Sequence, residues 1–146
     1  MFAKILFPTD FSDVSKKALD YIKKLKGAGT KEVIVLHVVD EREIESLAHH
    51  AARDFDIKEV EKNRDHYTKE QLELIKDELK ESGLKVKVRT ERGIPFREIL
   101  RVEEEEGVSV TVLGSHGKSL VKEMLLGSVS EKVIRKSSKP VLVIRR

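Results

Sequence analysis

Short apolar runs alternate along this chain with longer stretches in which apolar residues recur every three or four positions. Most of the short runs are apolar almost throughout, as expected of strands that are buried on both faces. These four runs are residues 3–7, 33–39, 108–113 and 140–144. The helical spacing lies between them, in residues 12–25, 57–83, 96–102 and 129–136. Residues 84–90 alternate strictly between apolar and basic side chains, apart from the final threonine, which predicts a fifth strand with one solvated face.

Strands that alternate with helices predict an α/β domain in which helices cover both faces of a parallel sheet. The basic strand, residues 84–90, suits a sheet edge, because lysines discourage pairing with other chains. Strand order 3-2-1-4-5, counted along the chain, places it there and buries the strands that are apolar on both faces. We therefore predict one three-layer α/β/α domain over residues 1–146, with a five-stranded parallel sheet of Rossmann-like type.

Three further features each predict a local property of the chain. Residues 41–56 are compatible with a partial helix or with a flap over a ligand, and both alternatives stay open. His37, inside an apolar strand, is expected to be packed and hydrogen-bonded rather than to bind a ligand. The run of four glutamates before Gly107 is expected to form a solvated face at the end of its helix.

Composition excludes several classes of protein. The chain has 146 residues, no cysteine, and 38% charged residues with a net charge of only +3, which argues against a nucleic-acid binder with a dominant basic face. No apolar run approaches the roughly 20 residues that cross a bilayer, and the N-terminus lacks a secretory pattern, so we expect a cytoplasmic protein and no membrane partner. Asn63 and Gln71 are the only side-chain amides, a composition typical of thermophiles.

A glycine motif carries the clearest chemistry. Gly114-Ser-His-Gly117 is followed, after nine intervening residues, by Gly127-Ser128, between a predicted strand and a predicted helix. This layout presents backbone N–H groups and a helix N-terminus to a phosphate. Ser128 and Ser130 would add hydroxyl donors, and Ser128 could also be the N-cap of the last helix. A Walker A loop is excluded, because Val112 occupies the position of its first glycine.

The predicted strand order brings a second motif to the same place. Ligands of such sheets bind outside the carboxyl ends of the strands at the topological switch point, here between the first and fourth strands. The two loops at that point contain Pro8-Thr9-Asp10 and residues 114–127. Asp10 has two interpretations there: it binds a cation such as Mg²⁺ beside phosphates, or it caps the following helix.

The last strand predicts an oligomer. It is apolar on both faces and yet lies at a sheet edge in this order, where an uncovered apolar strand is a liability. Twofold pairing of two such edges is the simplest remedy, so we predict a homodimer. The pairing would use Val141, Leu142, Val143 and Ile144. The alternative is that Arg145 and Arg146 alone protect a short edge.

Five segments in chain order resemble the universal stress protein family, in its ATP-binding branch. They are residues 5–12, 36–38, 114–117, 126–129 and 139–143. The glycine signature of that branch, G-x2-G-x9-G-[ST], is met in full, and residues 41–64 are the part without a clear counterpart. The resemblance implies a fold like that of the adenine nucleotide alpha hydrolases, a Mg²⁺ or Mn²⁺ ion, and dimerisation through the fifth strand.

The resemblance also implies roles for individual residues. Pro8, Thr9 and Asp10 would line the nucleotide site at the end of the first strand. Val38 would contact adenine through its backbone, and Leu113 would flank the base or the ribose. The ribose and the phosphates would be held by Gly114, Ser115, Gly117, Gly127, Ser128, Val129 and Ser130.

Catalytic equipment is not evident beside this glycine loop. His116 is expected to be an exposed loop histidine, no lysine occupies a P-loop position, and no arginine finger can be identified. We therefore favour a switch in which ATP orders residues 114–127 and an unidentified protein partner reads the ordered surface. The alternatives are a slow, partner-dependent ATPase that uses Asp10 and His116, and a dimeric interaction module that binds AMP, ADP or no nucleotide.

Overall fold

The predicted strands form one parallel sheet in the order β3-β2-β1-β4-β5. The computed structural model describes residues 1–50, 57–117 and 126–146. The strands are β1 (Lys4–Pro8), β2 (Glu32–Asp40), β3 (Lys85–Gly93), β4 (Val110–Gly114) and β5 (Val141–Ile144). Both the parallel pairing and the strand order confirm the prediction, including the placement of the basic strand at one edge.

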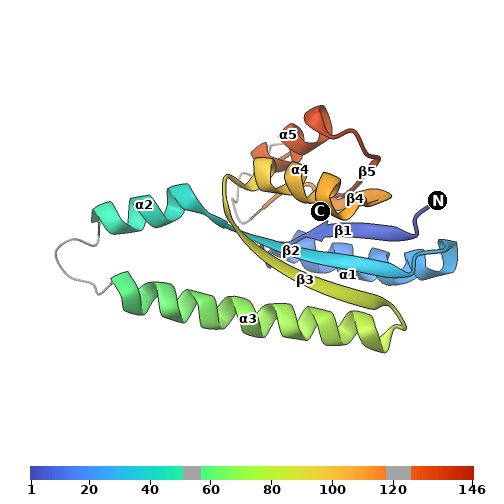
Figure 1. The fold of residues 1–146 in the computed structure, drawn as a ribbon, viewed down its shortest axis with the longest axis horizontal. Helices are drawn as coiled ribbons and strands as arrows, with labels where there is room; N and C mark the ends of the chain where they lie inside the picture. Colours follow the sequence, from blue (N-terminus) through green and yellow to red (C-terminus); the bar gives the residue numbers. More distant parts are fainter. Residues whose placement is uncertain (51–56, 118–125) are drawn as a thin grey trace.

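Helices cover both faces of this sheet (Figure 1). They are α1 (Asp13–Leu25), α2 (Glu41–His50), α3 (Ile57–Glu81), α4 (Pro95–Glu106) and α5 (Ser128–Lys136), with a short 3-10 turn η1 (Lys26–Ala28) after α1. Side chains of α1 and α3 pack on one face, and those of α4 and α5 pack on the other. The three-layer α/β/α architecture is therefore as predicted.

The central strand β1 supplies both apolar cores. Its side chains point alternately to opposite faces, so Ile5 and Phe7 join the core under α1 and α3, where Ala18 lies. Leu6 joins the core under α4 and α5, together with Val133. All three β1 side chains are at most 1% exposed. A strand covered on both faces must be apolar without alternation, which is why this run is continuous.

The segment between β2 and α3 is helical where the structure describes it. α2 begins directly after β2, and Figure 1 shows it continuing past the carboxyl end of that strand while α3 runs back along the sheet. The Asp40 carboxylate accepts a hydrogen bond from the backbone N–H of Arg42 at 2.9 Å, which supports the start of the helix. Of the predicted helix or flap, the helix holds through residue 50, and residues 51–56 lie outside the described residues.

The acidic end of α4 corrects one expectation, because two of its four glutamates are not solvated. Glu103 is 1% exposed and accepts hydrogen bonds from the hydroxyls of Thr111 (2.7 Å) and Ser137 (2.8 Å). The Glu106 side chain is 10% exposed and bonds to Lys87 Nζ at 2.7 Å. Charge alone predicted a wet face, but helical periodicity turns these two positions toward β3, β4 and the end of α5.

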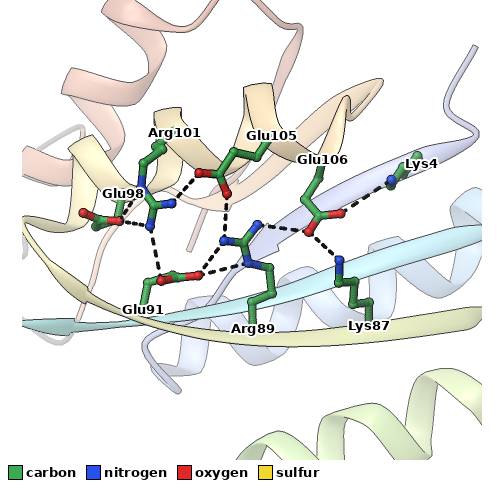
Figure 2. A network of polar contacts seen from close by, with 8 residues as sticks. All are labelled: Lys4, Lys87, Arg89, Glu91, Glu98, Arg101, Glu105 and Glu106. Carbon is green, nitrogen blue, oxygen red and sulfur yellow. Dashed lines mark hydrogen bonds and ion pairs between the residues drawn. The ribbon is translucent and has the colours of Figure 1, made fainter.

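A charged network joins α4 to the edge strand β3 (Figure 2). The Arg89 guanidinium donates to Glu91 at 2.6 Å, to Glu105 at 2.9 Å and to Glu106 at 3.0 Å. Hydrogen bonds from Arg89 lower the pKa of the Glu91 and Glu105 carboxyls, and the hydrogen bond from Lys87 lowers the pKa of Glu106. The basic side chains of β3 therefore neutralise the acidic run as well as protecting the sheet edge.

Candidate functional site

The loop after β1 forms a tight turn that ends in α1. The Thr9 N–H donates to the carbonyl of Leu36 in β2 at 2.8 Å. Asp10 Oδ1 accepts from the N–H of Ser12 at 3.0 Å, and Ser12 Oγ accepts from the N–H of Ser15 at 3.3 Å. Ser12 is therefore the N-cap of α1. The interpretation of Asp10 as the helix cap is wrong, because its Oδ1 closes the turn before the helix begins.

Phe11, between Asp10 and Ser12, has a left-handed backbone conformation that the sequence did not predict. Its φ is +66°, and it is the one non-glycine residue with positive φ among those that the structure describes. Such a conformation costs a bulky residue on the order of 1–3 kcal/mol, so surrounding contacts must hold it. The Phe11 ring stacks on the His37 ring with centroids 4.7 Å apart, and it forms a T-shaped pair with the Tyr67 ring, with centroids 6.1 Å apart.

His37 is packed and hydrogen-bonded, as expected. Its Nδ1 lies 2.9 Å from the carbonyl oxygen of Thr9. A carbonyl can only accept, so Nδ1 carries the proton and donates. His37 thus ties the end of β2 to the turn that carries Asp10.

The loop after β4 is held at both of its described ends. The Ser115 N–H donates to the carbonyl of Ile144 at 2.8 Å, and the Gly127 N–H donates to the carbonyl of Ser115 at 2.6 Å. The Ser130 hydroxyl donates to the carbonyl of Gly114 at 2.7 Å. These bonds bring the two ends of the predicted phosphate loop together, while its middle, residues 118–125, lies outside the described residues.

The loops after β1 and β4 meet, as the topology predicted. A Cβ placed on Gly117 would lie 2.7 Å from Asp10 Oδ2, so a side chain there would push the carboxylate aside. A Cβ on Gly114 would lie 2.8 Å from Val14 Cγ1, so this glycine also lets α1 pack against the end of β4. The absence of side chains at the two glycines therefore permits the close approach of this loop to Asp10 and of the end of β4 to α1.

The N-terminus of α5 lies where the loops after β1 and β4 meet, a place called the junction below and defined by Asp10, Gly114, Gly117 and Gly127. Gly127 is its N-cap, with extended φ and ψ of −71° and 161°, and Ser128 is its first helical residue. Ser128 as N-cap is therefore wrong, since glycine takes the cap position one residue earlier. The first N–H groups of a helix have no carbonyl partner within it, and here they belong to Ser128, Val129 and Ser130. Together with the helix dipole they favour an anion.

Other predicted residues serve the core as well as the junction. Leu113 is 4% exposed and packs, with the half-buried Val38, in the core under α4 and α5. Ser115 is 1% exposed, and its hydroxyl lies 2.7 Å from His116 Nδ1. His116 is half-buried rather than exposed as expected. Pro8 is half-buried at the end of β1. Because the side chains of Val38 and Leu113 pack in the core, contacts from these two residues to a ligand would come chiefly from their backbone.

The residues present fit a metal ion that is shared with a ligand. Within the described ranges, no group of three or more histidine or acidic side chains could hold a metal by itself. Asp10 Oδ2 nevertheless faces the space that a Cβ on Gly117 would fill. One carboxylate completed by phosphate oxygens and waters is the usual set for Mg²⁺.

Comparison with known proteins identifies the family. Residues 1–145 match the universal stress protein family. This chain belongs to that family. The resemblance stated from the five sequence segments is therefore confirmed.

Two curated universal stress proteins illustrate how close the likeness is. The chain is 46% identical to universal stress protein MJ0577 of Methanocaldococcus jannaschii, over 100% of this chain and 96% of the relative. It is 36% identical to universal stress protein YxiE of Bacillus subtilis, over 99% of this chain and 100% of the relative. The solved structure of MJ0577 superposes with a TM-score of 0.87, covering 100% of this chain and 97% of that one.

More distant solved relatives share the universal stress protein fold. One is a universal stress protein in complex with cAMP, with a TM-score of 0.65 and 23% identity over 99% of this chain and 97% of that chain. Another is the universal stress protein of Archaeoglobus fulgidus in complex with dAMP, with a TM-score of 0.64 and 20% identity over 99% of this chain and 98% of that chain.

In the part of this chain that the structure describes, no helix has the length and apolar character to cross a bilayer.

Proposed function

We propose that this universal stress protein binds ATP between the carboxyl ends of β1 and β4 and acts as a nucleotide-dependent switch. The observation that carries the proposal is the position of Asp10 Oδ2, which lies 2.7 Å from the point where a Cβ on Gly117 would stand. Oδ1 of this carboxylate closes the turn before α1, while Oδ2 faces the glycine loop. A cation and a polyphosphate between the two loops would give Oδ2 a role as a ligand.

The proposed binding mode uses the junction from both sides. The phosphates lie at the N-terminus of α5 and on the backbone of Gly117 and Gly127, with Mg²⁺ or Mn²⁺ held by Asp10. Adenine contacts the backbone of Val38, and Leu113 flanks the base. Adenine as the base is supported by the solved family members that carry cAMP and dAMP.

The switch is preferred to an enzyme because, among the residues that the structure describes around this site, the backbone N–H groups at the N-terminus of α5 are the main candidates to contact phosphates. The Ser130 hydroxyl is engaged with the Gly114 carbonyl. A slow ATPase is the second candidate, favoured by one observation: an imidazole, that of His116, lies in the phosphate loop and bonds to Ser115. A module that binds AMP or ADP is the third, and all three would operate in the cytoplasm.

We further propose that the protein is a homodimer through β5. In the sheet this strand pairs with β4 on one side, and it lies at the edge of the strand order. Leu142 is 38% exposed there, between the half-buried Val141 and Val143. Pairing with the β5 of a second copy would cover these groups.

Calorimetry with ATP, with and without magnesium, tests the nucleotide proposal. Asp10→Asn keeps the Oδ1 acceptor for the Ser12 N–H but removes the charge, so it should weaken magnesium–ATP binding by about tenfold or more and spare AMP. His116→Asn should leave ATP binding unchanged in a switch. No heat and no thermal stabilisation with wild-type protein would overturn nucleotide binding, and rapid ATP turnover by the protein alone would overturn the switch.

A further inference from the structure

The turn that carries Asp10 is held from two other elements by an aromatic clamp, defined here as Phe11, His37 and Tyr67. Phe11 follows Asp10 directly, His37 lies in β2, and Tyr67 lies in α3. The Phe11 ring is nearly parallel to that of His37, with an interplanar angle of 24°, and nearly perpendicular to that of Tyr67, at 87°. Both arrangements are favourable for aromatic pairs, so the clamp fixes the Phe11 ring from two sides.

The clamp acts on the backbone as well as on the ring. Phe11 is 8% exposed, and its N–H donates to Thr9 Oγ1 at 3.1 Å. His37 donates from Nδ1 to the carbonyl of the same Thr9. The left-handed φ of Phe11 reverses the chain between Asp10 and Ser12. The carboxylate of Asp10 faces Gly117, and Ser12 is the N-cap of α1. Burial of the ring therefore sustains the reversal, and the reversal directs the Asp10 carboxylate.

A bulky aromatic is an unexpected residue at this backbone position. Glycine or asparagine would adopt the left-handed conformation at lower cost. Strain of this kind persists only where the surroundings over-determine it, and it concentrates at functional sites. This position therefore depends on a side chain that packs against other elements, rather than on a residue that adopts the left-handed conformation easily.

We propose that Phe11 is a positioning residue for the metal-bound phosphates, and that the aromatic clamp holds Asp10 against the glycine loop. The inference rests on the proposed function, because it assigns Asp10 to the metal. It adds that β2 and α3, through His37 and Tyr67, set the position of a carboxylate that neither element contains. Loosening the clamp should affect the magnesium-dependent part of ATP binding and leave AMP binding in place.

The test compares calorimetric affinities for ATP with magnesium, ATP with a chelator, and AMP in matched variants. Phe11→Gly keeps the left-handed backbone accessible and removes the ring. Tyr67→Ala removes the edge contact at a position that is 49% exposed, and Tyr67→Phe keeps that contact. Phe11→Gly should lose about tenfold or more of the gain in affinity that magnesium gives wild-type protein, because small misplacements of a positioned group are costly. Tyr67→Ala should lose part of it, and Tyr67→Phe none.

The outcomes separate the two proposals. If wild-type protein gives no heat with magnesium and ATP, the proposed function fails. If wild-type protein binds and both Phe11→Gly and Tyr67→Ala keep the full magnesium gain, the positioning role alone is overturned. If Phe11→Gly does not fold, the half-exposed Tyr67 pair decides. An equal loss for AMP and for magnesium–ATP would show general damage to the site and would likewise overturn a role directed at Asp10.

Discussion

Asp10 Oδ2 lies 2.7 Å from the point where a Cβ on Gly117 would stand, although the two residues belong to loops at opposite ends of the sequence. The strand order explains the contact, since β1 and β4 are neighbours and both end at this edge of the sheet. Each residue constrains the other: a side chain at position 117 would displace the Asp10 carboxylate, and the glycine leaves space for that carboxylate.

Gly117→Ala should weaken magnesium–ATP binding by about tenfold or more, because the new Cβ displaces the Asp10 carboxylate. Stability should change little, since the φ of Gly117 is not positive and the alanine side chain is small. Gly27→Ala is the matched control, because a Cβ there meets nothing within 4 Å. Calorimetry and thermal melts check both variants, and full affinity in Gly117→Ala would contradict the placement of the ligand.

Gly114→Ala should destabilise the fold by about 1–3 kcal/mol, the usual cost of overpacking. Its Cβ would lie 2.8 Å from Cγ1 of Val14, which is 3% exposed and cannot move into solvent. The double variant Gly114→Ala with Val14→Ala should cost less than the sum of the two single changes, because the second removes the clash. Urea unfolding of the four proteins completes the cycle, and strict additivity would argue against the predicted contact.

Glu103→Ala should destabilise the protein by about 2–4 kcal/mol, because it removes the acceptor of the buried Thr111 hydroxyl, removes the shorter of the two hydrogen bonds that the Ser137 hydroxyl donates, and leaves a cavity. The neighbouring Glu104→Ala should cost no more than about 0.5 kcal/mol, since that residue is exposed. Urea unfolding at neutral pH measures both. Equal small effects would mean that the two buried hydrogen bonds contribute little.

The network around Arg89 predicts loss of stability in acid. The pKa values of Glu91, Glu105 and Glu106 are lowered from the usual 4.5. A carboxyl with a lowered pKa in the folded state contributes stability above its unfolded pKa, and that contribution is lost as pH falls through the folded value. The free energy of unfolding should therefore decline below about pH 4.5. Urea titrations between neutral and acid pH measure the slope.

A pair of variants assigns that slope. Glu106→Gln should lower stability at neutral pH and make the acid decline shallower, because one of the responsible carboxyls is gone. Glu131→Gln, which breaks an exposed pair with Arg135, should change neither, since such pairs contribute little. An unchanged slope in Glu106→Gln would place the acid sensitivity elsewhere.

Leu142→Lys should convert the proposed dimer to a folded monomer, because a charge at the centre of β5 opposes pairing of two such edges. Leu74→Lys is the control: Leu74 is 63% exposed on α3, which packs against β3 at the other edge. Sedimentation velocity at micromolar concentrations distinguishes the species. Wild-type protein that sediments only as a monomer would contradict the dimer.

Most of the fold was predictable, because apolar periodicity and helix-breaking glycines are local properties of the chain. The continuous runs around Leu6 and Ile34 and the alternating strand of Lys85 and Lys87 were enough to assign the strands and their order. The prediction of a solvated acidic run was wrong for Glu103, because the burial of this side chain depends on which side of α4 meets β4. The prediction of Ser128 as the N-cap was wrong because the boundary of α5 lies one residue earlier, at a glycine that fits the cap conformation.

By itself, the sequence determined the strand order, the glycine signature and hence the place where Asp10 and the loop after β4 would meet, because hydrophobic spacing and crossover handedness leave few alternatives. Only the tertiary structure decided the left-handed backbone of Phe11, its grip by His37 and Tyr67, and the burial of Glu103. These features depend on contacts between segments far apart in the chain, and no local pattern encodes a contact whose partner is set by the packing of another element.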